Sequence, residues 1–201
     1  MVTKLLIATT NKNKIEEIKK EFENFEYFDF IFLDDLNFEI EDPEETEETL
    51  EGNSLLKAKY YAEKTGLNTL ADDSGLFVND LDGWPGVHSA RVADSHKEKC
   101  DLVLEKLKGI DLSKRNASFR TVITFYDPNT KTSKSVLGKV NGLISEEYPA
   151  IIKTGFGYDP IFFVPKLNKI YDDLSLEEKN EISHRGQAIR KMKEYLQTQI
   201  C

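Results

Sequence analysis

The sequence has few of the features that mark secreted, membrane or nucleic-acid-binding proteins. Its 201 residues include only two cysteines, Cys100 and Cys201, too few for a disulfide framework and not spaced as a metal site. No apolar run approaches the roughly 20 residues of a membrane span. The run Leu5 to Ala8 meets polar residues at once, unlike a signal peptide. Lysine and arginine number 27 against 36 acidic residues, a net charge of −9. We therefore expect a cytoplasmic protein that binds neither membranes nor nucleic acid.

Common signatures of hydrolases are absent as well. The polar loop Thr9 to Lys14 has neither the glycines nor the GK[ST] ending of a P-loop. Ser74 does not stand in the G-x-S-x-G context of a serine nucleophile, and no Ser/His/Asp triad is visible. No Cys/His cluster suggests zinc. The sequence thus predicts neither a P-loop NTPase, a serine hydrolase nor a zinc protein.

What the chain does have is the composition and patterning of a soluble α/β domain. Hydrophobic residues are 39% and charged residues 31%, and the length predicts a single domain over residues 1–201. A buried-strand pattern at 4–8 precedes helical spacing over 12–24. Alternation from 119 to 140, broken by an Asp-Pro-Asn turn, indicates a hairpin, and helical spacing returns at 186–199. Helices interspersed with strands predict a mixed sheet. Capping boxes that mark helix starts are Ser95 with Glu98 and Ser175 with Glu178.

The loop Thr9 to Lys14 is the first candidate for chemistry. It leaves a strand and opens a helix, where backbone N–H groups and the helix dipole favour an anion. Asn11 could orient a phosphate and Lys14 could neutralise it. The alternative is an ordinary helix N-cap with lysines in solvent.

An acidic run precedes the next predicted helix. It contains Glu39, Glu41, Asp42, Glu44, Glu45, Glu47, Glu48 and Glu51. Such runs are mostly solvated loops, but one or two acids could reach a divalent cation, since Mg²⁺ favours one or two carboxylates plus substrate phosphates. Asn53 and Lys57 are four residues apart and share a helix face. Lys57 is either a ligand of a triphosphate or a surface lysine.

Asp72 and Asp73 form the most informative pair. They end an apolar strand, which we expect to be interrupted by Asp73-Ser74-Gly75 before it resumes at 76–78. Ligands commonly bind at strand ends in α/β sheets. Adjacent strand residues point to opposite faces, so the two acids should do different jobs. An Asx-type turn is the alternative.

Aromatic and basic residues gather near the C-terminus. Residues 155–160 combine two glycines, two aromatic rings and an acid, which suits stacking and hydrogen bonding to a nucleobase. A tight turn with core aromatics is the alternative. Lys179, His184 and Arg185 stand just before the last helix, where cations suit an oxyanion or a carbonyl.

Together and in this order, these clusters resemble the inosine triphosphate pyrophosphatase family, enzymes that remove non-standard purine nucleoside triphosphates. The matching stretches, which span nearly the whole chain, are Ala8–Lys14, Glu44–Ala58, Leu70–Leu76, Gly83–Arg91, Gly155–Phe162 and Lys179–Ala188.

The resemblance implies a fold, a reaction and an assembly. The fold would be α/β, an elongated mixed β-sheet flanked by helices, with two lobes and a central cleft. The reaction would be NTP + water → NMP + pyrophosphate, with ITP, dITP and XTP preferred over ATP and GTP. It would require Mg²⁺, with Mn²⁺ as a substitute, and the protein would be a homodimer.

The resemblance also assigns roles to residues. Asp73 would activate the attacking water. Metal ligands would be Glu45, Asp72 and Asp73. The phosphates would be handled by Thr9, Thr10, Asn11, Lys12, Asn13, Lys14, Lys57, Ser74 and Lys179. The base would be recognised by Phe156, Gly157, Tyr158, Asp159, His184 and Arg185.

The chain departs from the family at two site positions. The family has Gly where Thr10 stands, and Glu where Gly52 stands, which removes one candidate acid and shifts weight to Glu45. Two other functions stay open from the sequence. One is an NTP phosphatase that releases orthophosphate, and the other is a non-catalytic nucleotide-binding module.

Overall fold

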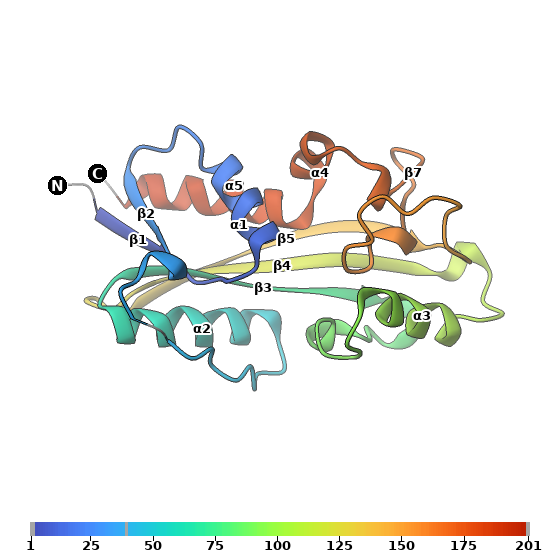
Figure 1. The fold of residues 1–201 in the computed structure, drawn as a ribbon, viewed down its shortest axis with the longest axis horizontal. Helices are drawn as coiled ribbons and strands as arrows, with labels where there is room; N and C mark the ends of the chain where they lie inside the picture. Colours follow the sequence, from blue (N-terminus) through green and yellow to red (C-terminus); the bar gives the residue numbers. More distant parts are fainter. Residues whose placement is uncertain (1–2, 39, 200–201) are drawn as a thin grey trace. The chain divides into compact units, whose positions relative to one another are not determined.

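The computed structural model describes residues 3–38 and 40–199 (Figure 1). The chain divides into two compact units. The first unit comprises Met1–Asp73, Thr121–Gly138 and Arg185–Cys201, and the second comprises Ser74–Arg120 and Lys139–His184. Strands β3, β4 and β5 contribute residues to both units. No helix among the described residues is both long and apolar enough to cross a bilayer.

The strands form a mixed sheet in the order β2-β1-β3-β4-β5-β6-β7. Strand β1 pairs in parallel with β2 and β3, whereas β6 pairs antiparallel with β5 and β7. The predicted α/β class with a mixed sheet flanked by helices is confirmed. The strands are β1 Thr3–Ile7, β2 Phe28–Phe32, β3 Asn68–Val78, β4 Asn116–Asp127, β5 Thr132–Ile144, β6 Phe162–Val164 and β7 Lys169–Ile170.

The first unit has helices on both faces of its strands (Figure 1). Side chains alternate along a strand, so Leu5 and Ile7 of β1 pack with helices α1 (Lys12–Glu21) and α5 (His184–Thr198). Leu6 and Ala8 point the other way, into a core built on α2 (Leu50–Thr65). Thr49 caps the start of α2 by accepting a hydrogen bond from Gly52, and Gly66 ends it at φ +70°.

The second unit is built around aromatic residues of three segments. Phe119 of β4 packs its ring against Phe162 of β6 and against Tyr171. Helices α3 (His96–Lys106) and α4 (Leu176–Ile182) begin at the two predicted capping boxes, both of which are confirmed.

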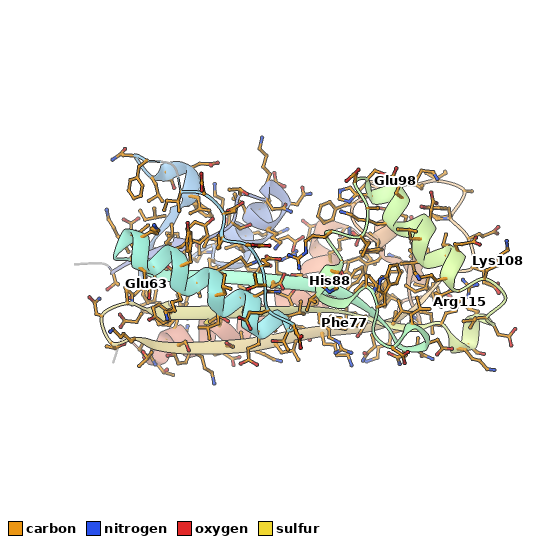
Figure 2. All side chains as sticks on the ribbon, turned by 90° about the horizontal axis from the view of Figure 1, so that it is seen from below. Glu63, Phe77, His88, Glu98, Lys108 and Arg115 are labelled. Atoms are coloured by element: carbon orange, nitrogen blue, oxygen red, sulfur yellow. The ribbon has the colours of Figure 1, made fainter. Side chains whose placement is uncertain are left out.

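Arg115, labelled in Figure 2, holds the end of α3 in place. Its buried guanidinium donates to the backbone carbonyls of Leu107, Ile110 and Ser145 at 2.8–2.9 Å. The Leu107 carbonyl at the end of α3 also accepts from the backbone N–H of Ile110 at 3.0 Å, so the arginine adds a second donor there.

The expected interruption of β3 at residues 73–75 is wrong. The strand runs without a break from Asn68 to Val78. Gly75 permits close packing rather than a turn, because a Cβ there would lie 2.2 Å from the carbonyl oxygen of Gly86. Ser89 completes this contact by accepting a hydrogen bond from the backbone of Leu76 at 2.8 Å.

Candidate active site

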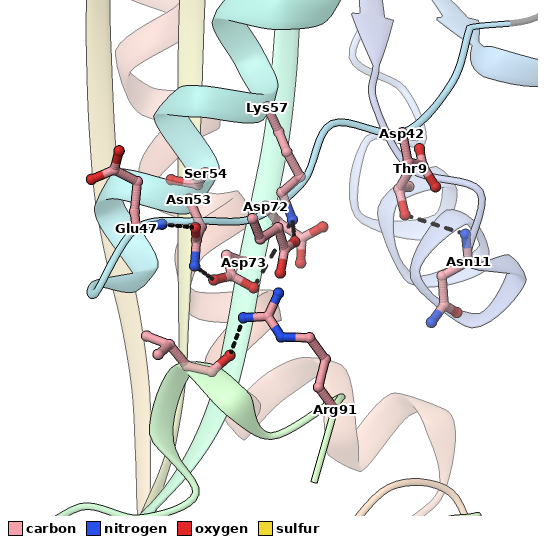
Figure 3. Close-up of polar contacts among 12 residues, drawn as sticks. Thr9, Asn11, Asp42, Glu47, Asn53, Ser54, Lys57, Asp72, Asp73 and Arg91 are labelled. Atoms are coloured by element: carbon pink, nitrogen blue, oxygen red, sulfur yellow. Dashed lines mark hydrogen bonds and ion pairs between the residues drawn. The ribbon is translucent and has the colours of Figure 1, made fainter. Parts of the chain in front are cut away.

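Asp72 and Asp73 are neighbours on β3 (Figure 3), and their partners lie on opposite faces of the strand, as predicted. The side chain of Asp72 points in the same direction as that of Leu70 and contacts α1 and α5. The side chain of Asp73 points in the same direction as that of Ala71 and contacts α2. Both are almost fully buried, with 4% and 6% of their surfaces exposed. Burying carboxylates is costly unless cations or hydrogen-bond donors satisfy them, so their partners define the site.

Asp72 is held between two cations. Lys14 Nζ lies 2.9 Å from its Oδ2 and Arg185 Nε 3.6 Å from the same atom. The other side of the Arg185 guanidinium bonds Glu17 at 2.6 Å. Burial alone would raise the pKa of Asp72, but Lys14, Arg185 and nearby Lys57 outweigh it and hold the pKa well below its usual range. Asp72 is therefore ionised and compensated.

Asp73 has weaker compensation. Asn53 Nδ2 donates to its Oδ2 at 3.2 Å, and Lys57 Nζ lies 4.0 Å from its Oδ1. Lys57 is closer to Glu45, with Nζ 2.6 Å from Oε1. Burial raises the pKa of Asp73 to about 6, and the charge of Glu45 adds to the effect while Lys57 opposes it. A carboxylate tuned toward neutral pH in a polar site is the profile of a general base.

The acidic run lies along α2 and runs antiparallel to the helix, held by hydrogen bonds and an ion pair. Its contacts, taken from the C-terminal end of the helix, are Asp42 with Tyr61, Glu45 with Lys57, Glu47 N–H with Asn53 Oδ1, and Thr49 with Gly52. Most of its acids are exposed, but Glu45 is half-buried. Glu39, one of the eight acids, lies outside the described residues.

Glu47 occupies the space above Gly52. A Cβ built on that glycine would lie 2.7 Å from Glu47 Cβ and 3.1 Å from its Oε2. The side chain missing at position 52 is thus replaced in space by an acid from the run before the helix.

The loop Thr9 to Lys14 contains the helix N-cap that the sequence offered as the alternative interpretation. Asn11 caps α1, because its Oδ1 accepts from the backbone N–H groups of Asn13 at 3.1 Å and Lys14 at 3.4 Å. Thr9 Oγ1 accepts from Asn11 N–H. Thr10, Lys12 and Asn13 are exposed. Lys14 instead turns toward Asp72 and is not a solvent lysine.

The predicted base-recognition loop belongs to the second unit. Phe156 is half-buried between Gly155 at φ +61° and Gly157 at φ +57°, backbone conformations that favour glycine. Tyr158 is a core residue whose hydroxyl donates to the Ser89 carbonyl at 2.8 Å. Asp159 forms an ion pair of 2.7 Å with Lys179.

The remaining predicted residues fall in different surroundings. His184 stacks on Phe119 in the second unit, with ring centroids 5.1 Å apart and planes at 17°. Arg185, its neighbour in sequence, belongs to the first unit and binds Glu17 and Asp72. Ser74 is the half-buried residue after Asp73.

Sequence reasoning missed Asn53 and Glu17 as members of the site. Asn53 is fully buried, and it connects the acidic run to Asp73. From the sequence, Asn53 could be predicted only to share a helix face with Lys57, four residues later; its burial could not be predicted. Glu17 follows Lys14 by three residues on α1, and that spacing was the available signal.

Glu45 and Asp73 are the residues best placed to hold a cation. Within the described part of the chain, no three His, Cys, Asp or Glu side chains gather as a metal cluster. Mg²⁺ needs only one or two protein carboxylates when substrate phosphates complete its shell. Glu45 and Asp73 both flank Lys57, and burial together with the charge of Glu45 raises the pKa of Asp73. The donor set therefore fits the ion.

The fold and the site define an α/β protein with lysine-flanked carboxylates on both faces of one central strand. Comparison with known proteins assigns the chain to a family within this class. The model of the Ham1 family matches residues 5–195, so the chain belongs to the Ham1 family, and the resemblance to inosine triphosphate pyrophosphatases is confirmed.

Individual relatives match over nearly their full length. The dITP/XTP pyrophosphatase of Staphylococcus epidermidis is 44% identical over 194 residues, and that of Bacillus subtilis is 40% identical over 195, with 96% of each chain covered. The structure of a HAM1 protein from Coxiella burnetii superposes with a TM-score of 0.88 at 36% identity, covering 98% of this chain and 99% of that one.

Proposed function

We propose that this chain is a metal-dependent nucleoside triphosphate pyrophosphatase that converts dITP, ITP and XTP to the monophosphate and pyrophosphate. The names of its relatives support the substrate class. The observation that carries the proposal is the group Glu45, Lys57 and Asp73, in which a buried carboxylate with a pKa of about 6 stands beside a lysine.

Asp73 is the base of the proposed reaction. At neutral pH its carboxylate accepts a proton from water as the water oxygen bonds to the α-phosphorus. The bond from that phosphorus to the bridging oxygen of the β-phosphate breaks, and pyrophosphate leaves. Asn53 Nδ2 donates to Oδ2 of Asp73, and Lys57 Nζ lies 4.0 Å from Oδ1. General-base catalysis of this kind contributes about 10²- to 10⁴-fold.

Glu45 and Asp73 would hold Mg²⁺, which when bound neutralises phosphate charge and polarises the phosphoryl group. Asp72, the third predicted ligand, is engaged by Lys14 and Arg185 and would have to release one of them. Lys57 and Lys14 would offset the remaining charge of the triphosphate. Both start from ion pairs with carboxylates, so phosphate oxygens would replace or share these partners.

The loop around Phe156 would recognise the base. The ring offers a stacking face, and stacking on an aromatic side chain is worth about 1–3 kcal/mol per base. The family resemblance assigns Lys179 to the phosphates, but its ion pair with Asp159 places it beside this loop. A lysine donor here suits the 6-oxo group of hypoxanthine or xanthine. Adenine presents an amino group there and would leave the donor unpaired.

Product analysis tests the proposal. The purified protein is incubated with ITP, XTP, GTP and ATP, with and without Mg²⁺, and nucleotides, pyrophosphate and orthophosphate are separated. We expect Mg²⁺-dependent IMP and pyrophosphate, formed much faster from ITP than AMP is from ATP. Release of IDP and orthophosphate would move the cut to the γ-phosphate and overturn the proposal.

The proposal includes a homodimer, which the family resemblance implies, and a cytoplasmic location, which the sequence predicts. Light scattering of the purified chain checks the homodimer, with a mass near twice 23.0 kDa expected. A mass of one chain at working concentration would contradict it.

A further inference from the structure

One face of α3 packs against the loop that carries Phe156. His96 and Cys100 are four residues apart and therefore share a helix face. The centroid of the His96 ring lies 5.1 Å from that of Phe156, with the ring planes at 59°. One turn further along, Cys100 Sγ donates to the carbonyl of Gly157 at 3.3 Å. The helix thus touches both the ring and the backbone of the loop.

Phe156 depends on outside contacts for its orientation. Both neighbours are glycines in the left-handed region, at φ +61° and +57°, and glycine restricts the backbone less than any other residue. A Cβ added at Gly157 would meet no heavy atom within 4 Å. Hydrogen bonds from Gly155 N–H to Asp172 and from Phe156 N–H to Thr154 Oγ1 hold the loop backbone, and the His96 ring is an aromatic surface that contacts the Phe156 ring.

His96 suits this role as a neutral ring. Partial burial and the nearby charge of Lys99 lower its pKa, so the imidazole is uncharged at neutral pH. Aromatic pairs prefer tilted or edge-to-face arrangements with centroids 4.5–7 Å apart, and the observed pair lies in this range. His96 itself is exposed, so the core does not require it.

We propose that His96 is a positioning residue of the base subsite, whose imidazole backs the Phe156 ring and fixes the direction in which that ring meets a purine. The inference rests on the proposed function, because it assumes that Phe156 stacks on the base. It adds a residue from a separate helix to the specificity of the site.

The experiment compares His96→Ala with His96→Phe. We expect His96→Ala to weaken ITP binding roughly two- to tenfold, the value of one aromatic pair. His96→Phe restores binding because it keeps the ring. Binding is measured by calorimetry with ITP in EDTA, so turnover is not needed. In steady state with Mg²⁺, KM for ITP rises and kcat stays unchanged, a split that a general loss of stability would not produce.

Matched controls separate this inference from the proposed function. Glu105→Ala alters an exposed residue further along α3 and leaves binding unchanged. Phe156→Ala tests the loop itself. If Phe156→Ala weakens ITP binding and His96→Ala does not, the role of His96 is overturned and the proposed function stands. If Phe156→Ala has no effect, the proposed base recognition fails and the inference fails with it.

The double variant shows whether His96 acts through Phe156. In the Phe156→Ala background, His96→Ala should cost nothing further, because coupled residues are not additive. An undiminished loss of ITP binding in that background would mean that His96 contacts the base directly, and it would overturn the positioning role.

Discussion

Asp72 and Asp73 are identical side chains on neighbouring residues of one strand, yet their surroundings give them opposite properties. On one face of β3, two cations keep Asp72 ionised far below its usual pKa. On the other face, burial raises the pKa of Asp73 to about 6, with Lys57 4.0 Å away. The pair shows that strand alternation supplies two chemical environments within a single dipeptide. A compensated carboxylate holds structure, whereas an undercompensated one is available for proton transfer.

Removing the base should produce the largest effect. Asp73→Asn keeps the size and the hydrogen bond to Asn53 but cannot accept the proton, so we expect kcat to fall about 10²- to 10⁴-fold. The melting temperature should stay the same or rise, because a neutral amide replaces a buried carboxylate whose charge is disfavoured. Steady-state kinetics with ITP and a thermal melt measure both. Retained kcat with an unchanged melting temperature would show that another group is the base.

Asp72→Asn should have the opposite effect on stability and destabilise the protein. It leaves Lys14 and Arg185 without their shared carboxylate inside the protein, and breaking a buried ion pair costs about 3–5 kcal/mol. We expect a large loss in the free energy of unfolding, measured by denaturant titration at pH 7. An equal stability of the Asp72→Asn and Asp73→Asn variants would remove the contrast between the two faces.

The sequence predicted the part of this contrast that depends on local geometry. The alternation of Asp72 and Asp73 follows from the strand period, and it held because β3 is continuous. The partners could not be predicted, since the Lys14–Asp72 pair joins residues 58 positions apart and depends on how α1 packs on the sheet. The expected break at Gly75 failed for the same reason. A glycine that permits a turn and one that permits close approach of Gly86 look identical in sequence.

The contacts of the acidic run could not be predicted from the sequence either. Its charge indicated a solvated loop, and most of its acids are exposed. Its attachment to α2 arises from Tyr61, Lys57 and Asn53, which recur along one side of that helix. Helical spacing of polar residues was visible, but their pairing with the preceding segment became clear only in the fold.

A third buried aspartate, Asp172 in the second unit, sharpens the comparison. It is compensated by backbone rather than by cations, accepting from the N–H groups of Lys153, Thr154 and Gly155. Burial alone would raise its pKa, but the hydroxyl of Thr154 and these backbone donors lower it.

The pH dependence of stability should reveal this compensation. A folded-state pKa below the unfolded value means that Asp172 contributes stability above about pH 4, and that the contribution is lost as pH falls through the folded pKa. Asp172→Asn should therefore cost about 2 kcal/mol at pH 7, since hydrogen bonds to a charged group are worth about 1.5–3 kcal/mol. The cost should shrink toward pH 3 in denaturant titrations. A cost that does not change with pH would assign the stabilisation to packing rather than to charge.

Asn53 should show the smallest effect and the most specific one. It contributes no charge, and its amide only connects Glu47 N–H to Asp73 Oδ2. Asn53→Asp preserves the shape and the acceptor for Glu47 but places a second acid against Asp73, whereas Asn53→Ala removes both bonds. We expect Asn53→Ala to lower kcat about threefold to tenfold, which corresponds to about 0.6–1.4 kcal/mol, the net free energy of about one hydrogen bond. Asn53→Asp should lower it further, because like charges in one buried site oppose the ionised form of the base.

Ser54→Ala, at the neighbouring buried position that bonds Thr124 rather than Asp73, is the matched control. If Ser54→Ala lowers kcat as much as Asn53→Ala, the loss comes from loosening α2, and the orientation of Asp73 does not depend on the amide.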